Sequence, residues 1–311
     1  MPGWLIAIIV LAVLAASYIA ICYAFANLLL YPKRQPVVRS PDEYGLKYEN
    51  VEFKSTDGLK LKGWFIPGAL KKIIIVTHPM FCNRHGYLTR NQSLLASAGT
   101  SDIDLLSSIK ALNQAGYSIL TFDFRNHGES EKGMTGVGLN EYQDVLGAMD
   151  YLESRRDLDT SGLAFVSFCM GANSTIVAMS KAKERFKKVK CLLAFQPISF
   201  QIFVRSYLKA NYTPLGLALM PLMERICRWR GGYPLKEMSP REFVKDIAVP
   251  TLYVQGKADR WTELTDIQSF YDRTPEPKAL LWLEEKMSRP ESYNYFGKHP
   301  EKMLEFVRSH F

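Results

Sequence analysis

The chain has 311 residues, of which 47% are hydrophobic and 23% are charged, with 20 Gly and 16 Pro. This profile excludes a disordered, collagen-like or repeat-dominated chain. Lysine and arginine together number 39, against 31 aspartate and glutamate residues, and the net charge of +8 favours an anionic partner, either nucleic acid or phospholipid.

An apolar segment begins the chain. No charged side chain occurs before Lys33, and residues 4–31 are almost all apolar. About 20 such residues cross a bilayer as a helix, so we expect residues 1–32 to form one transmembrane anchor, with residues 33–47 as a linker. With a membrane as neighbour, the net positive charge favours anionic lipid over nucleic acid.

The flanks of this segment predict its orientation. Lys33, Arg34 and Arg39 follow the apolar run directly, which predicts that the rest of the chain lies in the cytoplasm. A cleaved signal peptide is the alternative, because Ala24-Phe25-Ala26 resembles a cleavage site. The basic N-terminal region of a signal peptide is missing, however, and the apolar run is too long, so we favour a retained anchor.

Beyond the linker, apolar runs and helical patterns alternate. Such alternation predicts a mostly parallel sheet with helices on both faces, in one domain over residues 48–311. We expect two antiparallel strands in 48–66, joined by a turn at Asp57-Gly58, and further strands at 73–76, 117–122, 163–167, 191–195, 251–254 and 280–283. We expect helices at about 102–114, 140–154, 172–183 and 300–309. In such sheets the ligand site lies at the carboxyl ends of the strands.

Cysteine usage fits a cytosolic domain. The five cysteines are an odd number at scattered positions, which indicates neither a disulfide framework nor a zinc site. One of them, Cys169, lies in Ser167-Phe168-Cys169-Met170-Gly171, between a predicted buried strand and a helix. A nucleophile on such a tight turn needs small residues two before and two after it, and the following helix N-terminus favours a thiolate. Cys169 is therefore a candidate nucleophile, although an ordinary buried cysteine fits the same position.

The order of these elements resembles the α/β-hydrolase family. Four matches carry the resemblance: His78-Pro79 after the third strand, the segment from Asp123 to Ser130 after the fourth, the turn at Cys169 after the fifth, and Gly256-Lys257-Ala258-Asp259 after 251–254. The resemblance implies an eight-stranded type of sheet flanked by helices, with a cap over the site. It does not by itself imply an activity.

The resemblance also implies roles for single residues. Cys169 occupies the position where family members usually have Ser. A Cys in this position is similar to the thiol hydrolases of the dienelactone hydrolase type. Met80 and Met170 would supply backbone amides to an oxyanion hole, and Asp259 matches the acid that orients a histidine. His78 and His127 match positions that neighbour the site, and for His127 a structural role is favoured.

The sequence departs from the family at the base. Family members place a histidine about a dozen residues before the final helix, and here that position falls near Met287-Ser288-Arg289, without a histidine. His299 and His310 are the later candidates. His299 directly precedes Pro300 and is kept as the candidate base, while His310 is better explained by its place in the last helical turn.

The cap is expected at about 197–246, with Phe200, Phe203, Leu215, Leu219 and Met223 available to an apolar ligand. No P-loop, G-x-G-x-x-G after the first parallel strand or H-x-x-x-H pair occurs, so no nucleotide or metal cofactor is expected. Two functions remain open. One is a membrane-anchored hydrolase of ester or thioester bonds with an acyl or lipid-like substrate, and the other is a non-catalytic protein that binds a lipid or a protein partner.

Overall fold

A computed structural model describes residues 1–91, 101–284 and 286–311. Its centre is an eight-stranded sheet with the strand order β1-β2-β6-β3-β7-β8-β9-β10. The strands are β1 (Glu49–Lys54), β2 (Lys60–Ile66), β3 (Ile73–Thr77), β6 (Ser118–Phe122), β7 (Leu163–Phe168), β8 (Val189–Phe195), β9 (Thr251–Gly256) and β10 (Lys278–Leu283). This arrangement confirms the predicted α/β-hydrolase fold.

The pairing of the strands follows their composition. β1 and β2 form an antiparallel pair, and β2 pairs antiparallel with β6, while the strands from β6 to β10 are parallel. All residues of β3, β6 and β7 are buried, as expected for β-branched and aromatic runs covered on both faces. Their carboxyl ends therefore meet at one edge of the sheet, where the loops that carry candidate residues begin.

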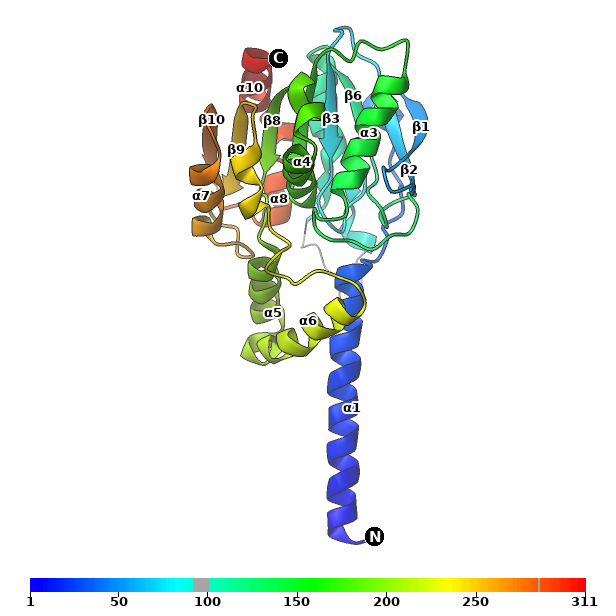
Figure 1. The fold of residues 1–311 in the computed structure, drawn as a ribbon, viewed down its shortest axis with the longest axis vertical. Helices are drawn as coiled ribbons and strands as arrows, with labels where there is room; N and C mark the ends of the chain where they lie inside the picture. Colours follow the sequence, from blue (N-terminus) through cyan, green and yellow to red (C-terminus); the bar gives the residue numbers. More distant parts are fainter. Residues whose placement is uncertain (92–100, 285) are drawn as a thin grey trace.

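Helices cover both faces of the sheet. In Figure 1 α3 and α4 lie in front of the strands, where they pack against each other, and α2, α9 and α10 belong to the opposite face. The helices of the domain are α2 (Leu105–Gln114), α3 (Tyr142–Ser154), α4 (Met170–Lys181), α7 (Leu264–Arg273), α8 (Arg289–Tyr293), α9 (Tyr295–Lys298) and α10 (Glu301–His310). Short elements complete it: β4 (Gly86–Tyr87), β5 (Ile103–Asp104), η1 (Pro41–Tyr44), η2 (Thr89–Asn91), η3 (Lys183–Lys188), η5 (Pro240–Glu242) and η6 (Val244–Asp246).

Several elements differ from the sequence prediction, among them two helices. The helix expected from residue 102 begins at Leu105, because Ile103 and Asp104 pair with β4 and the Asp104 carboxylate accepts from the Ser107 amide as an N-cap. Helix α7 was not predicted. Its buried residues are Asp266, Ile267 and Phe270, which is too short an apolar pattern to indicate a helix.

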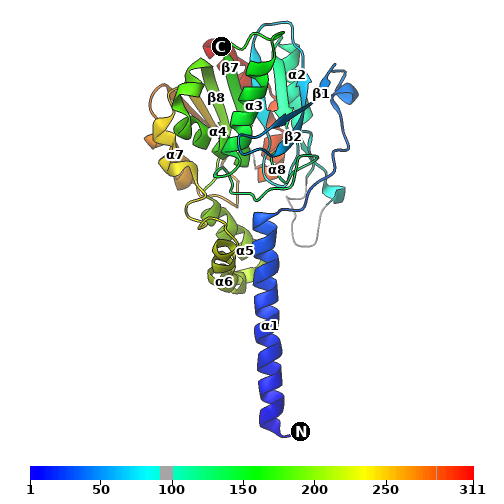
Figure 2. The same ribbon diagram turned by 45° about the vertical axis from the view of Figure 1, so that its right-hand side comes forward.

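The first helix, α1 (Gly3–Leu30), is long and apolar enough to cross a membrane. Figures 1 and 2 show it extending away from the domain, with its last turns beside two helices of the cap. The cap consists of α5 (Phe200–Gly216), η4 (Leu217–Leu219) and α6 (Met220–Trp229). Cys22, Phe25, Ala26 and Leu30 of α1 are buried, so the end of this helix belongs to the core of the protein.

Candidate functional site

Cys169 lies on a strained turn between β7 and α4. Its φ of 51° and ψ of −112° are unusual for a residue with a side chain, and its amide donates to the Phe195 carbonyl oxygen at 2.7 Å. Gly171 is required by close packing, because a Cβ there would lie 2.4 Å from Thr77 Oγ1. Ser167 is buried, and its hydroxyl shares a 3.0 Å hydrogen bond with that of Thr175. The small residues that the sequence places around Cys169 therefore have the expected steric cause.

Asp259 follows β9, and its carboxylate is saturated with hydrogen bonds. It accepts from the Trp261 amide at 2.9 Å, from the Thr262 hydroxyl at 2.7 Å and from Gln255 Nε2 at 3.2 Å. The fourth partner is the guanidinium of Arg289, which forms a buried ion pair with the Asp259 carboxylate. The acid expected from the sequence is thus present, and its charged partner is an arginine.

Arg289 occupies the position where the family resemblance implies the base. It begins α8 and is held there by a capping box between Ser288 and Glu291. Besides Asp259, its guanidinium donates to the Gln196 carbonyl oxygen at 2.6 Å, and the side chain is almost completely buried. The sequence count located this position and found no histidine in it, and only the structure identifies Arg289 as the residue that reaches Asp259.

Cys169, Arg289 and Tyr293 form one electrostatic cluster. Burial lowers the pKa of Arg289, but Asp259, Tyr293 and Cys169 together raise this pKa above its ordinary value, so the guanidinium stays charged. Burial raises the pKa of Tyr293 well above its ordinary value, Arg289 opposes this, and Cys169 adds to it. The candidate nucleophile therefore has a permanent cation and a neutral phenol as neighbours.

His299, the candidate base, is not brought to this cluster. It is exposed at the end of α9, and its ring lies 5.1 Å from the ring of Tyr295. None of the five histidines of the chain, all within the described ranges, lines the cavity at Cys169. The structure accordingly pairs Asp259 with Arg289 and leaves His299 at the surface.

His78 and His127 are buried neighbours with ring centroids 5.1 Å apart. His78 donates from Nδ1 to the Pro79 carbonyl oxygen at 2.8 Å and accepts at Nε2 from the Phe124 amide at 3.0 Å. Burial lowers the pKa of His78 to about 4 and that of His127 to about 3, the latter also because of His78. Both rings are therefore neutral near pH 7. Their hydrogen bonds hold the loop after β3 and the loop after β6 in place.

Two amides are available near Cys169 for an oxyanion. Met170 is the first residue of α4, and Met80 lies in the loop after β3 and lines the cavity beside Cys169. Within the described parts of the chain, neither amide donates to a backbone carbonyl outside its own helix or strand. The oxyanion-hole role of these two amides stays a prediction from the resemblance.

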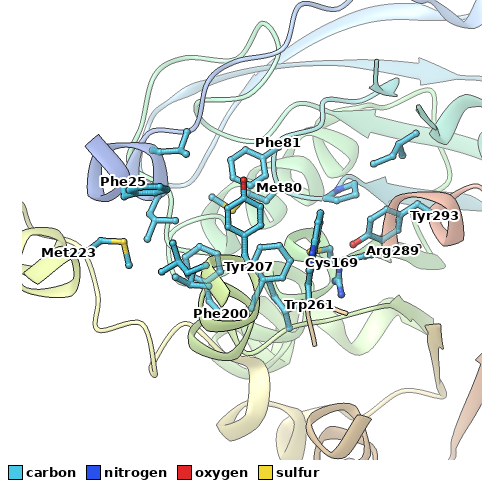
Figure 3. Close-up of a pocket in the computed structure, with 18 residues that line it drawn as sticks. Phe25, Met80, Phe81, Cys169, Phe200, Tyr207, Met223, Trp261, Arg289 and Tyr293 are labelled. Carbon is cyan, nitrogen blue, oxygen red and sulfur yellow. The ribbon is translucent and has the colours of Figure 1, made fainter. Parts of the chain in front are cut away.

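Cys169 lines an apolar cavity. Arg289 is the one charged residue among the described side chains that line it. Figure 3 shows Cys169, Arg289 and Tyr293 at one end of the cavity, and Phe25 and Met223 at the other. The remaining described lining residues are Leu28, Leu29, Pro79, Met80, Phe81, Ile103, Ile198, Phe200, Phe203, Val204, Tyr207, Leu208 and Trp261.

The cavity is lined by some of the expected cap residues and also by α1, which was not expected. Phe200, Phe203 and Met223 line the cavity as expected, whereas Leu219 is not part of its wall. The side chain of Leu215 lies outside the described residues. The contribution of α1 was not foreseen, because hydropathy alone assigned the whole segment to the membrane. Among the described residues, no group of three or more His, Cys, Asp or Glu side chains is arranged to hold a metal ion.

Comparison with known proteins agrees with this architecture. Residues 94–302 match the alpha/beta hydrolase fold family, and the chain belongs to that family. It is 24% identical over 292 residues to the uncharacterized protein YqkD of Bacillus subtilis, a match that covers 89% of this chain and 88% of YqkD. It is 22% identical over 291 residues to the uncharacterized protein YfhR of Escherichia coli K12, covering 91% of this chain and 87% of YfhR.

Solved structures show the same fold. The esterase Pf2001 of Pyrococcus furiosus superimposes with a TM-score of 0.68 at 21% identity, covering 89% of this chain and 98% of the esterase. The α/β hydrolase GrgF of a Penicillium species superimposes with a TM-score of 0.60 at 18% identity, covering 85% of this chain and 99% of GrgF. At these identities the likeness concerns the fold.

Proposed function

We propose that the protein is a membrane-anchored hydrolase of ester or thioester bonds with Cys169 as its nucleophile. The observation that carries the proposal is the strained turn that presents Cys169 to an apolar cavity. Strain of this kind costs about 1–3 kcal/mol and concentrates at functional sites. The esterase fold of Pf2001 supports the same reaction class.

Arg289 favours thioesters over oxygen esters as substrates. A guanidinium has no acceptor and keeps its proton at physiological pH, so Arg289 does not act as a base. Its charge instead attracts a thiolate, which needs no base in order to attack. A thiol leaves as a thiolate without protonation, whereas an alkoxide is far more basic and needs a proton donor.

The proposed acylation step uses Cys169, the charge of Arg289 and two backbone amides. The Cys169 sulfur bonds to the carbonyl carbon, the carbon–sulfur bond of the substrate breaks, and the released thiolate takes a proton from water. The amides of Met80 and Met170 donate to the carbonyl oxygen as it gains negative charge. Hydrolysis of the resulting acyl-Cys169 needs an activated water, and no imidazole lines the cavity. Deacylation is therefore expected to be the slow step.

We further propose that α1 is retained as the anchor, with the domain on the cytoplasmic side. Cleavage after Ala26 would remove Phe25, whose buried ring forms part of the cavity wall. The basic residues Lys33 and Arg34 directly after α1 support the cytoplasmic side.

The test uses the full chain in detergent micelles with an octanoyl thioester of N-acetylcysteamine. We expect a burst of about one released thiol per chain, slow turnover afterwards, and one octanoyl adduct in the intact mass. Cys169→Ala should abolish burst and adduct. Cys82→Ala is the matched control, because burial raises the pKa of the Cys82 thiol well above its ordinary value, and it should behave like wild type.

Arg289→His sharpens the same test, because it places an imidazole beside Asp259 in the position of the missing base. We expect its steady-state turnover to exceed that of wild type by at least tenfold, since general base catalysis typically contributes about 10²–10⁴-fold. Absence of both thiol release and adduct in the wild-type chain would disprove the hydrolase.

A second function is favoured by one observation, the buried Arg289–Asp259 ion pair in the position of the base. A non-catalytic protein that binds a lipid in the cavity has no need of a histidine there. It predicts that oleate raises the melting temperature of wild type and Cys169→Ala equally, with no thiol release from either protein.

A further inference from the structure

The exposure of α1 changes along its length. Side chains from Gly3 to Ile21 are exposed except for the half-buried Leu5, while Cys22, Phe25, Ala26 and Leu30 are buried. At 1.5 Å per residue the exposed part is about 28 Å long, which matches the roughly 30 Å hydrocarbon core of a bilayer. The membrane surface then falls where the cap meets α1.

The cap reaches down to this level. The hydroxyl of Tyr18 in α1 donates to the Ala218 carbonyl oxygen in η4 at 2.7 Å. Nη1 of Arg230, which directly follows α6, donates to Asn27 Oδ1 of α1 at 2.9 Å. In Figures 1 and 2, α5 and α6 lie below the sheet, beside the upper part of α1. η4 therefore lies beside the end of the exposed part of α1.

The outer surface of the cap suits a headgroup region. Trp229 is 79% exposed, and Arg225 and Arg228 on the same helix are exposed as well. Exposed Arg205 and Lys209 extend the positive charge along α5. Tryptophan is enriched at membrane interfaces, and basic residues are attracted to an anionic leaflet.

The cavity begins about 6–12 Å beyond this level of α1, at Phe25 to Leu29, and leads to the candidate nucleophile. Phe25, Leu28 and Leu29 form its wall on the side of α1, and Leu28 and Leu29 are only half-buried. Figure 3 shows the path from Phe25 and Met223 past Tyr207 and Phe200 to Cys169. Its described lining between these ends is apolar or aromatic, which suits a hydrocarbon chain.

We propose that the substrate resides in the bilayer and that its acyl chain enters the cavity sideways, between the end of α1 and the α5–α6 cap. The substrate class is a long-chain acyl lipid whose tail passes Leu29 and whose carbonyl reaches Cys169. The reaction at that carbonyl rests on the proposed function, whereas the route rests on the position of the cavity.

The experiment measures the route without turnover. Full-length Cys169→Ala protein is reconstituted in vesicles of phosphatidylcholine with one fifth phosphatidylglycerol and a trace of phosphatidylcholine carrying a diazirine in a 16-carbon chain. After illumination, adducts are mapped by peptide mass spectrometry. We expect adducts on residues 200–208 of α5, and at least a fivefold loss of these adducts when Leu29→Trp fills the entrance.

Leu14→Trp is the matched control, because Leu14 is exposed on the same helix and far along the chain from the cavity wall. It should leave the α5 adducts unchanged. Leu28→Trp serves as a second entrance variant in case Leu29→Trp lowers the melting temperature. Adducts confined to residues 3–21 of α1, or α5 adducts unaffected by both folded entrance variants, would overturn the route.

The two proposals fail separately. If α5 is labelled but the wild-type chain releases no thiol from the octanoyl thioester, the route holds and the hydrolase fails. If the wild-type chain is acylated by that soluble thioester but α5 receives no adduct, the hydrolase holds and the bilayer route fails.

Discussion

The ion pair between Arg289 and Asp259 is the residue-scale feature that most distinguishes this site. Both side chains are almost completely removed from solvent, with exposed fractions of 3% and 0%. Burying two charges is costly, and their attraction repays the cost only when further hydrogen bonds satisfy both groups. Gln196, Trp261 and Thr262 supply those bonds. The ion pair is therefore held in a fixed position near Cys169.

Loss of one partner should be costly for stability. Arg289→Met leaves the Asp259 carboxylate buried without its cation, and we expect the free energy of unfolding to fall by about 3–5 kcal/mol. Denaturant titration of the full chain in detergent measures this. Arg273→Met is the matched control, since its partner is the exposed Glu242, and the expected change is within about 1 kcal/mol. Equal effects of the two substitutions would contradict the structural role of the buried pair.

At the scale of elements, the junction of β3, β7 and α4 explains how the fold positions Cys169. β3 and β7 pair in parallel with Thr77 opposite Ser167, so the end of β3 lies against the start of α4. Gly171 faces Thr77 so closely that a Cβ would lie 2.9 Å from the Thr77 carbonyl carbon. The start of α4, directly after Cys169, is thus in close contact with β3 at a glycine.

Gly171→Ala should disturb this junction. Backbone atoms of β3 have to move, and we expect a loss of about 1–3 kcal/mol in stability together with slower alkylation of Cys169 by iodoacetamide. Gly3→Ala is the same substitution at a position with no atom within 4 Å, and it should change neither quantity. Thermal unfolding and timed mass spectrometry of the alkylated chain provide the readouts. Normal alkylation in Gly171→Ala would show that the turn at Cys169 tolerates a larger residue.

At the scale of the whole molecule, α1, residues 33–47 and the α/β domain share one core. The Thr135 amide donates to the Leu30 carbonyl oxygen at 2.9 Å, and Asn126 Nδ2 donates to the Pro32 carbonyl oxygen at 2.9 Å. Further along, Asn83 Nδ2 donates to the carbonyl oxygens of Gln35 and Pro36 at 3.2 and 3.1 Å. The separation into residues 1–32, 33–47 and 48–311 follows hydropathy, while these contacts cross both boundaries.

Truncation should reveal this shared core. Deleting residues 2–20 removes exposed apolar surface and keeps Phe25 and Leu30, so we expect little change in stability in detergent. Deleting residues 2–32 exposes the surfaces that these two side chains cover, at about 1.5–3 kcal/mol each. We therefore expect the longer deletion to lower the free energy of unfolding by about 3–6 kcal/mol. Equal stability of the two truncated chains would mean that α1 is an independent anchor.

The fold class could be predicted from the sequence, and so could the position of Cys169 on a tight turn between a strand and a helix. Both depend on local signals, which are apolar runs for the buried strands and small residues around a tight turn. The order of these elements along the chain then specifies the family. The role of Asp259 as the acid comes from the family resemblance.

The neighbours of Cys169, in contrast, could be identified only from the tertiary structure. Arg289 and Tyr293 reach Cys169 from α8, more than a hundred residues later in the chain, and the sequence marks neither as a site residue. The same holds for Phe25, which joins the cavity because α6 packs on α1. Contacts between distant segments depend on side-chain packing and on partners for buried charges. Neither can be predicted from the spacing of a motif.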